Sequence, residues 1–334
     1  MIQSAPIVNF ADSCFVDVDL TEIVTKPQDQ VIIDIEKKPA ISIWKAAETG
    51  NVEALSYFVQ NKTHLLDERD PNTECTLLHL LISNVSNPIQ PLKLLLEHGA
   101  DATARNMYNI QAIHAIFLHC INPLETAQML LLYDADPNAR DGDGWTPLHY
   151  AARFCPLPGP VLKLLIDAGA DIDATDVSRK SALFSLLANG DHSLTLDWLI
   201  HTIKANVKIK GDFLDRQTRR TKQGTLILQA AKYGRLSSLR IIVSSSTAME
   251  SLEPILTREE LEEAIDLVRQ QLLKVTTSEQ IERLGLIIMI LEDLIQKLFK
   301  NKKPSRQSLI KTRTNLLKRL LGVAITRTTV TAEK

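Results

Sequence analysis

The stretch that decides the fold lies near the middle of the chain and reads DGDGWTPLHYAA from Asp141 to Ala152. Thr146 is a residue type that caps helix N-termini, and Pro147 follows at the first helical position, where its missing N–H costs no hydrogen bond. Leu148 and the alanine pair that ends the stretch then fall on one helical face, where small residues permit close packing. The stretch therefore predicts a turn followed by a short helix that packs against a neighbour.

The same pattern recurs along the chain with a constant step. Related tetrads begin 35 residues apart, at Thr76, Gln111, Thr146 and Ser181. A second marker, which reads Gly-Ala-Asp in its clearest copies, keeps the same step from Gly99, Asp134, Gly169 and Lys204. Between the two markers, apolar residues such as Val161, Leu164 and Leu165 predict a second amphipathic helix. A unit of this size cannot bury both apolar faces alone, so we expect consecutive units to stack.

These units resemble the ankyrin repeat, whose signature includes T-P-L-H-x-A. The resemblance covers about residues 41–246, and two weaker copies, at 44–55 and 226–234, bring the expected number of repeats to six. It implies an all-α fold, an ankyrin-repeat solenoid of helix-turn-helix-hairpin units, which a small helical bundle follows. It also implies that the repeated histidines tie neighbouring units together through backbone and hydroxyl groups instead of binding a metal; these are His79, His114 and His149.

The sequence departs from the family pattern at the turns. The usual turn glycine is absent from three repeats, which have Glu74, Asn109 and Arg179 instead. About nine extra residues lie within Lys208 to Gln223, and we expect this segment to be a basic surface loop.

The repeat pattern stops at the triple serine 244–246. Two capping boxes, at Thr257 to Glu260 and at Thr277 to Gln280, each open an apolar pattern and predict helices. The second pattern alternates isoleucine and leucine from Ile281 to Leu298 at coiled-coil spacing, but it is short, and further apolar residues widen its surface. Two arrangements remain open: a small antiparallel bundle docked near the last repeat, or a homodimer through 278–300. A third, basic helix is expected at about 305–325.

Four segments follow from these patterns. They are an acidic N-terminal arm at 1–40 that is partly disordered, ankyrin repeats at 41–246, a helical C-terminal module at 252–325, and a flexible tail at 326–334.

Composition limits the function classes. The chain has 334 residues, 38 Lys and Arg against 40 Asp and Glu, and four cysteines without a C-x-x-C pair. We expect no zinc cage, no disulfide between Cys120 and Cys155, and no secretory signal. The longest apolar run, 286–291, is far short of the roughly 18 residues that a membrane-spanning helix needs. Phosphate-loop, metalloprotease, nucleophile-elbow and dinucleotide motifs do not occur, so we expect no enzyme activity, no catalytic residues, no metal and no cofactor.

The resemblance implies a protein-protein interaction scaffold or adaptor that holds its partner on hairpin tips and inner helices. By register, the partner-binding residues are expected to be Met107, Tyr108, Asp143, Trp145, Arg153, Phe154, Ser178, Lys180, Lys222, Lys232 and Tyr233. Trp145 has a second interpretation, in which it packs on the next hairpin. Tyrosine, tryptophan and arginine are the residue types that most often dominate binding energy at interfaces.

The charge distribution leaves the partner's class open. Positive charge near the sixth repeat favours an acidic or phosphorylated protein. The segment from Lys297 to Lys334 has eleven Lys and Arg and one acid. An alternative is therefore a protein that associates with nucleic acid or an anionic membrane through its basic C-terminal helix. The chain also resembles, in architecture, transcription co-regulators that combine interrupted ankyrin repeats with helical C-termini, and this resemblance implies a transcription co-regulator that acts through the same helix. We expect a cytoplasmic or nuclear location.

Overall fold

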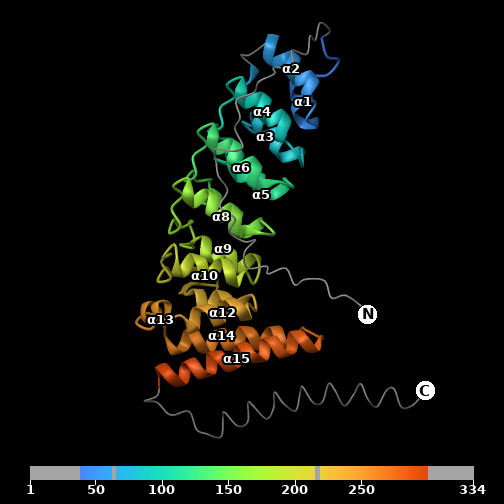
Figure 1. The fold of residues 1–334 in the computed structure, drawn as a ribbon. Coiled ribbons are helices and arrows are strands. Elements are labelled where there is room, and N and C mark those ends of the chain that lie inside the picture. The colour runs from blue at the N-terminus through green and yellow to red at the C-terminus, as the bar shows by residue number, and fades with distance from the viewer. Residues whose placement is uncertain (1–37, 62–64, 215–218, 300–334) are drawn as a thin grey trace, which may run out of the picture. The chain divides into compact units, whose positions relative to one another are not determined.

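The computed structural model describes residues 38–61, 65–214 and 219–299, and nearly all of them lie in helices and short connections (Figure 1). They divide into two compact units between residues 189 and 190. We call these unit 1 and unit 2. Most of the predicted acidic arm, the predicted third helix at 305–325 and the tail at 326–334 lie outside the described residues.

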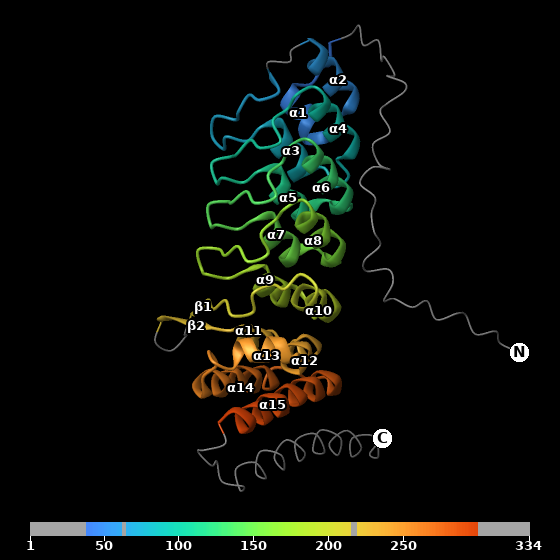
Figure 2. The ribbon, with the colours of Figure 1, turned by 60° about the vertical axis from the view of Figure 1, so that its left-hand side comes forward.

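Unit 1 has nine helices within its described part. Their bounds are α1 Ile43–Thr49, α2 Val52–Asn61, α3 Leu77–Asn84, α4 Ile89–Glu97, α5 Ala112–His119, α6 Pro123–Leu132, α7 Pro147–Phe154, α8 Pro158–Asp167 and α9 Ala182–Asn189. The first helix of each pair packs on the first helix of the next pair, so that α1, α3, α5, α7 and α9 form an inner row, and α2, α4, α6 and α8 form an outer row. Figure 2 shows the connections into α3, α5, α7 and α9 projecting from one side of the unit. The predicted stacking of helix pairs is confirmed.

Helix α7 shows how the decisive stretch folds. Thr146 is its N-cap with extended backbone, Pro147 is its first residue, and the Thr146 N–H donates to Nδ1 of His149 at 3.2 Å. Leu148, Ala151 and Ala152 are fully buried. The small alanines permit the close approach of α7 to its neighbours, as the sequence predicts.

The three repeated histidines join successive repeats of unit 1. In each, Nδ1 accepts from the backbone N–H of its own N-cap residue, and Nε2 donates to a carbonyl of the next connection. The Nε2–O distances are 2.8 Å from His79 to Ile110, 3.0 Å from His114 to Ala139 and 2.9 Å from His149 to Lys180. Burial lowers the pKa of all three imidazoles, so the neutral form is favoured in the folded chain. The structural role that the resemblance implies is confirmed.

Unit 2 contains six helices and one two-stranded sheet among its described residues. Their bounds are α10 Ser193–His201, β1 Gly211–Leu214, β2 Thr221–Gly224, α11 Leu226–Lys232, α12 Leu236–Ser244, α13 Ser246–Leu252, α14 Arg258–Leu272 and α15 Ser278–Leu298. Helices α11 and α12 form the last repeat-like pair, and α13 begins directly at the triple serine.

The segment within Lys208 to Gln223 is partly a hairpin, so the expectation of a surface loop is wrong there. Strand β1 pairs with β2 in antiparallel register, with Gly211 opposite Gly224. Neither strand shows an alternating apolar pattern in the sequence. Their pairing is set instead by the packing of Phe213, which is buried, and of β2 against α11.

Helix α14 closes the last repeat with a buried carboxylate. Thr225, the N-cap of α11, occupies the position of Thr146, but Leu228 replaces the histidine three residues later. Glu260 of α14 supplies the missing acceptor: its Oε1 accepts from the Thr225 N–H at 2.6 Å and from the Thr225 Oγ1 hydroxyl at 2.7 Å. The C-terminal module therefore continues the polar contact that histidine makes between the repeats of unit 1.

Only part of the predicted capping chemistry is present. Thr257 caps α14 and accepts from the Glu260 N–H at 3.2 Å. The Glu260 side chain bonds to Thr225 instead of returning to its own N-cap. Thr277 makes no side-chain cap bond to α15, so the second predicted capping box is wrong. The helix begins there nonetheless, because its apolar face is buried.

The C-terminal helices form a bundle within the chain, which is the first of the two arrangements that the sequence leaves open. Helix α15 packs against α14 and α12, and α14 packs against α11. Leu284, Ile288 and Leu291 of α15 are buried in these contacts. Dimerisation through 278–300 stays a prediction, and this burial leaves less apolar surface for it. No helix among the described residues combines the length and the apolar character that crossing a bilayer requires.

Candidate functional site: the fingers and inner helices of unit 1

Four connections project from unit 1, and we call residues 66–75, 101–110, 136–145 and 171–180 its fingers. Neighbouring fingers are joined at their tips by backbone hydrogen bonds. Met107 N–H donates to Thr73 O at 3.1 Å, Gly142 N–H to Tyr108 O at 2.9 Å, and Val177 N–H to Asp143 O at 3.0 Å. The tips therefore form one continuous edge in place of four independent loops.

A row of arginines strengthens the same edge. Nη1 of Arg105 donates to the Arg140 carbonyl at 2.7 Å, and Nη1 of Arg140 donates to the Thr175 carbonyl at 2.6 Å. Arg69 makes the equivalent contact to the Arg105 carbonyl. Each arginine thus reaches the finger that follows it, and we call the three an arginine ladder. A surface held in this way loses little conformational entropy when a partner binds.

The turns keep their left-handed backbone even where glycine is missing. Glu74, Asn109 and Arg179 have φ of 55°, 58° and 58° at the position that Gly144 occupies with φ 76°. A polar residue that begins each turn offsets the strain, as when Asp141 Oδ1 accepts from the Trp145 N–H at 2.8 Å. The turn therefore has the same backbone geometry in repeats that have different residues at this position.

An aromatic cluster joins the third finger to α7. The Trp145 ring lies 5.5 Å from that of Tyr150 and 6.2 Å from that of Phe154, measured between centroids. The Tyr150 hydroxyl donates to Asp141 Oδ2 at 2.8 Å, and burial together with this bond raises the pKa of Tyr150. Phe154 is 42% exposed at the end of α7, where the Arg153 guanidinium lies 5.8 Å from its ring centroid. Phe154 is therefore partly exposed to solvent while its ring packs against those of Trp145 and Tyr150.

Trp145 matches its second interpretation in large part. Its Nε1 donates to Asp176 Oδ2 of the next finger at 3.2 Å, and the residue is half-buried. It therefore packs between fingers, and only the remaining exposed part of its ring is available to a partner.

The fingertips carry exposed apolar side chains. Met107 is 51% exposed, Tyr108 61% and Val177 69%. With the exposed Asp143 between them, these four residues form what we call the fingertip patch. Val177 was not among the predicted site residues, although two 35-residue steps from Met107 lead to it through Gly142. The 35-residue register is the sequence signal that places Val177 at a fingertip.

The other predicted site residues are used in different ways. Ser178 and Lys180 are half-buried on the fourth finger, where the Lys180 carbonyl accepts from His149. In unit 2, Lys222 pairs with Glu263 at 2.5 Å. Lys232 lies over two rings, those of Phe213 at 5.5 Å and Tyr233 at 5.6 Å. The predicted site residues of unit 1 thus lie along the fingers and α7. The two predicted lysines of unit 2, Lys222 and Lys232, contact other residues of unit 2.

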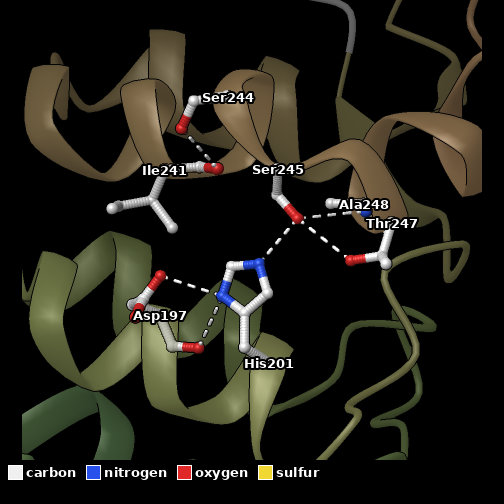
Figure 3. A network of polar contacts seen from close by, with 7 residues as sticks. All are labelled: Asp197, His201, Ile241, Ser244, Ser245, Thr247 and Ala248. Carbon is white, nitrogen blue, oxygen red and sulfur yellow. Dashed lines mark hydrogen bonds and ion pairs between the residues drawn. The ribbon is translucent and has the colours of Figure 1, made fainter.

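One polar network resembles a catalytic triad. His201 Nδ1 lies 2.9 Å from Asp197 Oδ1, and His201 Nε2 lies 2.7 Å from Ser245 Oγ (Figure 3). Ser245, however, is only 7% exposed, and its hydroxyl oxygen accepts from the Ala248 N–H as the N-cap of α13. A buried capping oxygen cannot reach a substrate carbonyl, so the network ties α10 to α13.

Metal and thiol chemistry have little basis in the described part of the chain. No three His, Cys, Asp or Glu side chains of residues 38–61, 65–214 and 219–299 converge as a metal site. Cys75, Cys120 and Cys155 are free thiols. Burial raises the pKa of Cys120 to about 11 and of Cys155 to about 12, which suppresses the reactive thiolate.

Comparison with known proteins agrees with the repeat geometry. Residues 114–211 match the family model described as ankyrin repeats (3 copies). None of the curated proteins compared with the chain matches it significantly. The match spans the third finger, the fourth finger and the helices that support them, and domains of this family generally mediate protein-protein interaction. The stacked helix pairs, the histidine contacts and the family match together show that residues 114–211 contain ankyrin repeats.

Proposed function

We propose that the chain is a non-catalytic adaptor that binds a partner protein through the fingertip patch and the exposed end of α7. The observation that carries this proposal is the exposure of Met107, Tyr108 and Val177 on tips that hydrogen bonds hold together. Tyrosine is one of the residue types that most often act as interface hot spots, and little ordering entropy opposes the burial of side chains that a rigid edge carries.

Two further candidates have less support. An acidic or phosphorylated partner would use the basic residues around β1 and β2, but Lys222 is paired with Glu263, and the Lys210 ammonium donates to the Ile255 carbonyl at 2.6 Å. A co-regulator, nucleic-acid or membrane role would act through residues 300–334, which lie outside the described residues. A cytoplasmic or nuclear location is part of the proposal because an adaptor of this kind needs access to intracellular partners.

Exchange of the fingertip residues tests the proposal. In the full-length chain, the double variant Tyr108→Ala/Val177→Ser should lose proteins that the wild type captures from a cell extract, with affinity reduced by about tenfold or more. Both side chains are exposed, so circular dichroism and the unfolding midpoint should stay unchanged. The matched control is Leu132→Ala, an equally exposed apolar residue on the outer helix α6 (56%). Equal capture by wild type, double variant and control would contradict the proposed site.

A further inference from the structure

The fingers of unit 1 are strongly acidic although the whole chain is nearly neutral. Residues 66–75, 101–110, 136–145 and 171–180 contain eleven Asp and Glu against five Lys and Arg, a net charge of −6. The full chain, by contrast, has a net charge of −2. Negative charge is therefore concentrated on the edge that carries the fingertip patch.

Three of the five cations of the fingers take part in the arginine ladder. Arg69, Arg105 and Arg140 each place one guanidinium nitrogen against the carbonyl of the next finger. Asp143, in contrast, is exposed at the tip, and its backbone carbonyl is the one that accepts from Val177. A carboxylate thus stands directly beside the exposed apolar side chains. The three arginines of the ladder bond to the neighbouring fingers, and Arg179 is the exposed cation on the fourth finger, two residues after Val177.

We propose that the fingertip patch binds a basic protein segment that carries at least one large apolar side chain. This inference rests on the proposed function and adds the partner's chemistry to it. The apolar residue would cover Tyr108 and Val177, and Lys or Arg residues on either side would face Asp143 and the remaining finger carboxylates. The same negative charge repels nucleic acid and anionic lipid, so a protein segment is the occupant that complements this edge.

Three synthetic peptides of twelve residues test the charge and the anchor separately. The first has six Lys and Arg with one Trp and one Leu, the second replaces every Lys and Arg by Glu, and the third keeps the cations but replaces Trp and Leu by Gly. Binding of each labelled peptide to the full-length chain is measured by fluorescence anisotropy at about 50 and about 300 mM salt, because exposed charge pairs are screened at the higher concentration.

The first peptide should bind most tightly, and its affinity should fall several-fold at the higher salt concentration. Asp143→Asn should weaken it about two- to fivefold at low salt, as expected for an exposed charge pair. Tyr108→Ala should weaken it about tenfold. Glu125→Gln removes the same charge from an exposed position on α6, so it is the matched control and should leave the dissociation constant unchanged.

The outcomes separate the inference from the proposed function. If the acidic peptide binds more tightly and Tyr108→Ala still weakens it, the fingertip site stands and the basic partner is wrong. If Asp143→Asn and Glu125→Gln weaken the basic peptide equally, the attraction is general to the acidic chain and the inference is overturned. If Tyr108→Ala affects none of the peptides although the double variant loses its captured proteins, the basic partner class is likewise wrong.

Discussion

Replacing His114 by alanine should lower the free energy of unfolding by about 3–5 kcal/mol. The imidazole is fully buried and joins two neighbouring repeats of unit 1. Its Nδ1 accepts from the Gln111 N–H at 3.1 Å, and its Nε2 donates to the Ala139 carbonyl at 3.0 Å. Alanine would leave both backbone groups buried without these partners. It would also leave a cavity beside Tyr150, whose ring lies 5.3 Å from that of His114. Urea denaturation of the full-length chain measures the loss.

The pH dependence of the same variant supplies a second readout. Burial lowers the pKa of His114 in the folded state, so below the ordinary value near 6.5 the unfolded chain binds the proton first. The stability that this group contributes is therefore present above about pH 6.5 and is lost as the pH falls. His114→Ala should show a smaller loss between pH 8 and pH 5 than the wild type. His98→Ala, at an exposed helix end, is the control. If both variants lose a similar free energy of unfolding, His114 does not hold the neighbouring repeats of unit 1 together.

The second large effect is expected at Glu260. Glu260→Ala should destabilise unit 2 by about 2–4 kcal/mol, because it removes a charge-assisted acceptor from the buried N–H and hydroxyl of Thr225. Hydrogen exchange should rise most in α11 and α14, the two helices that this carboxylate joins. Glu260→Gln keeps one carbonyl acceptor and should recover part of the stability.

The matched control is Glu262→Ala in the same helix. Glu262 is an exposed partner of Arg258 at 2.8 Å, so its loss should cost less than about 1 kcal/mol. If Glu260→Ala costs no more than Glu262→Ala, the carboxylate does not fasten the C-terminal module to the last repeat.

Much of the fold can be predicted from the sequence, because each 35-residue repeat is recognised by local features such as helix caps and helical periodicity. The 35-residue step placed the helix that begins at Pro147 and the histidine three residues after Thr146, because capping and helical periodicity depend on neighbours along the chain. Contacts between distant residues were harder to foresee. The link from Glu260 to Thr225 has no local signal, because the sequence around Glu260 has the pattern of an ordinary capping box. The hairpin of β1 and β2 has no local signal either, because packing forms it and neither strand has an alternating apolar pattern.

The candidate site was predictable to a similar degree. The 35-residue register alone predicts that Tyr108 and Asp143 lie on adjacent fingertips. It could not show that Trp145 would bond to Asp176, since side-chain direction within a finger is set by tertiary packing. The arginine ladder has a spacing of 36 and 35 residues that is visible in the sequence. Its meaning depends on carbonyl positions, however, and only the folded fingers reveal these.

The central claim is that the joined fingers of unit 1 are the surface to which a partner binds. Hydrogen exchange of the full-length chain, with and without a captured partner protein, tests it most directly. We expect slower exchange in peptides that cover 105–110, 141–146 and 176–180, with little change in the outer helices α4, α6 and α8. Unchanged exchange in those finger peptides, together with protection confined to residues outside unit 1, would contradict it.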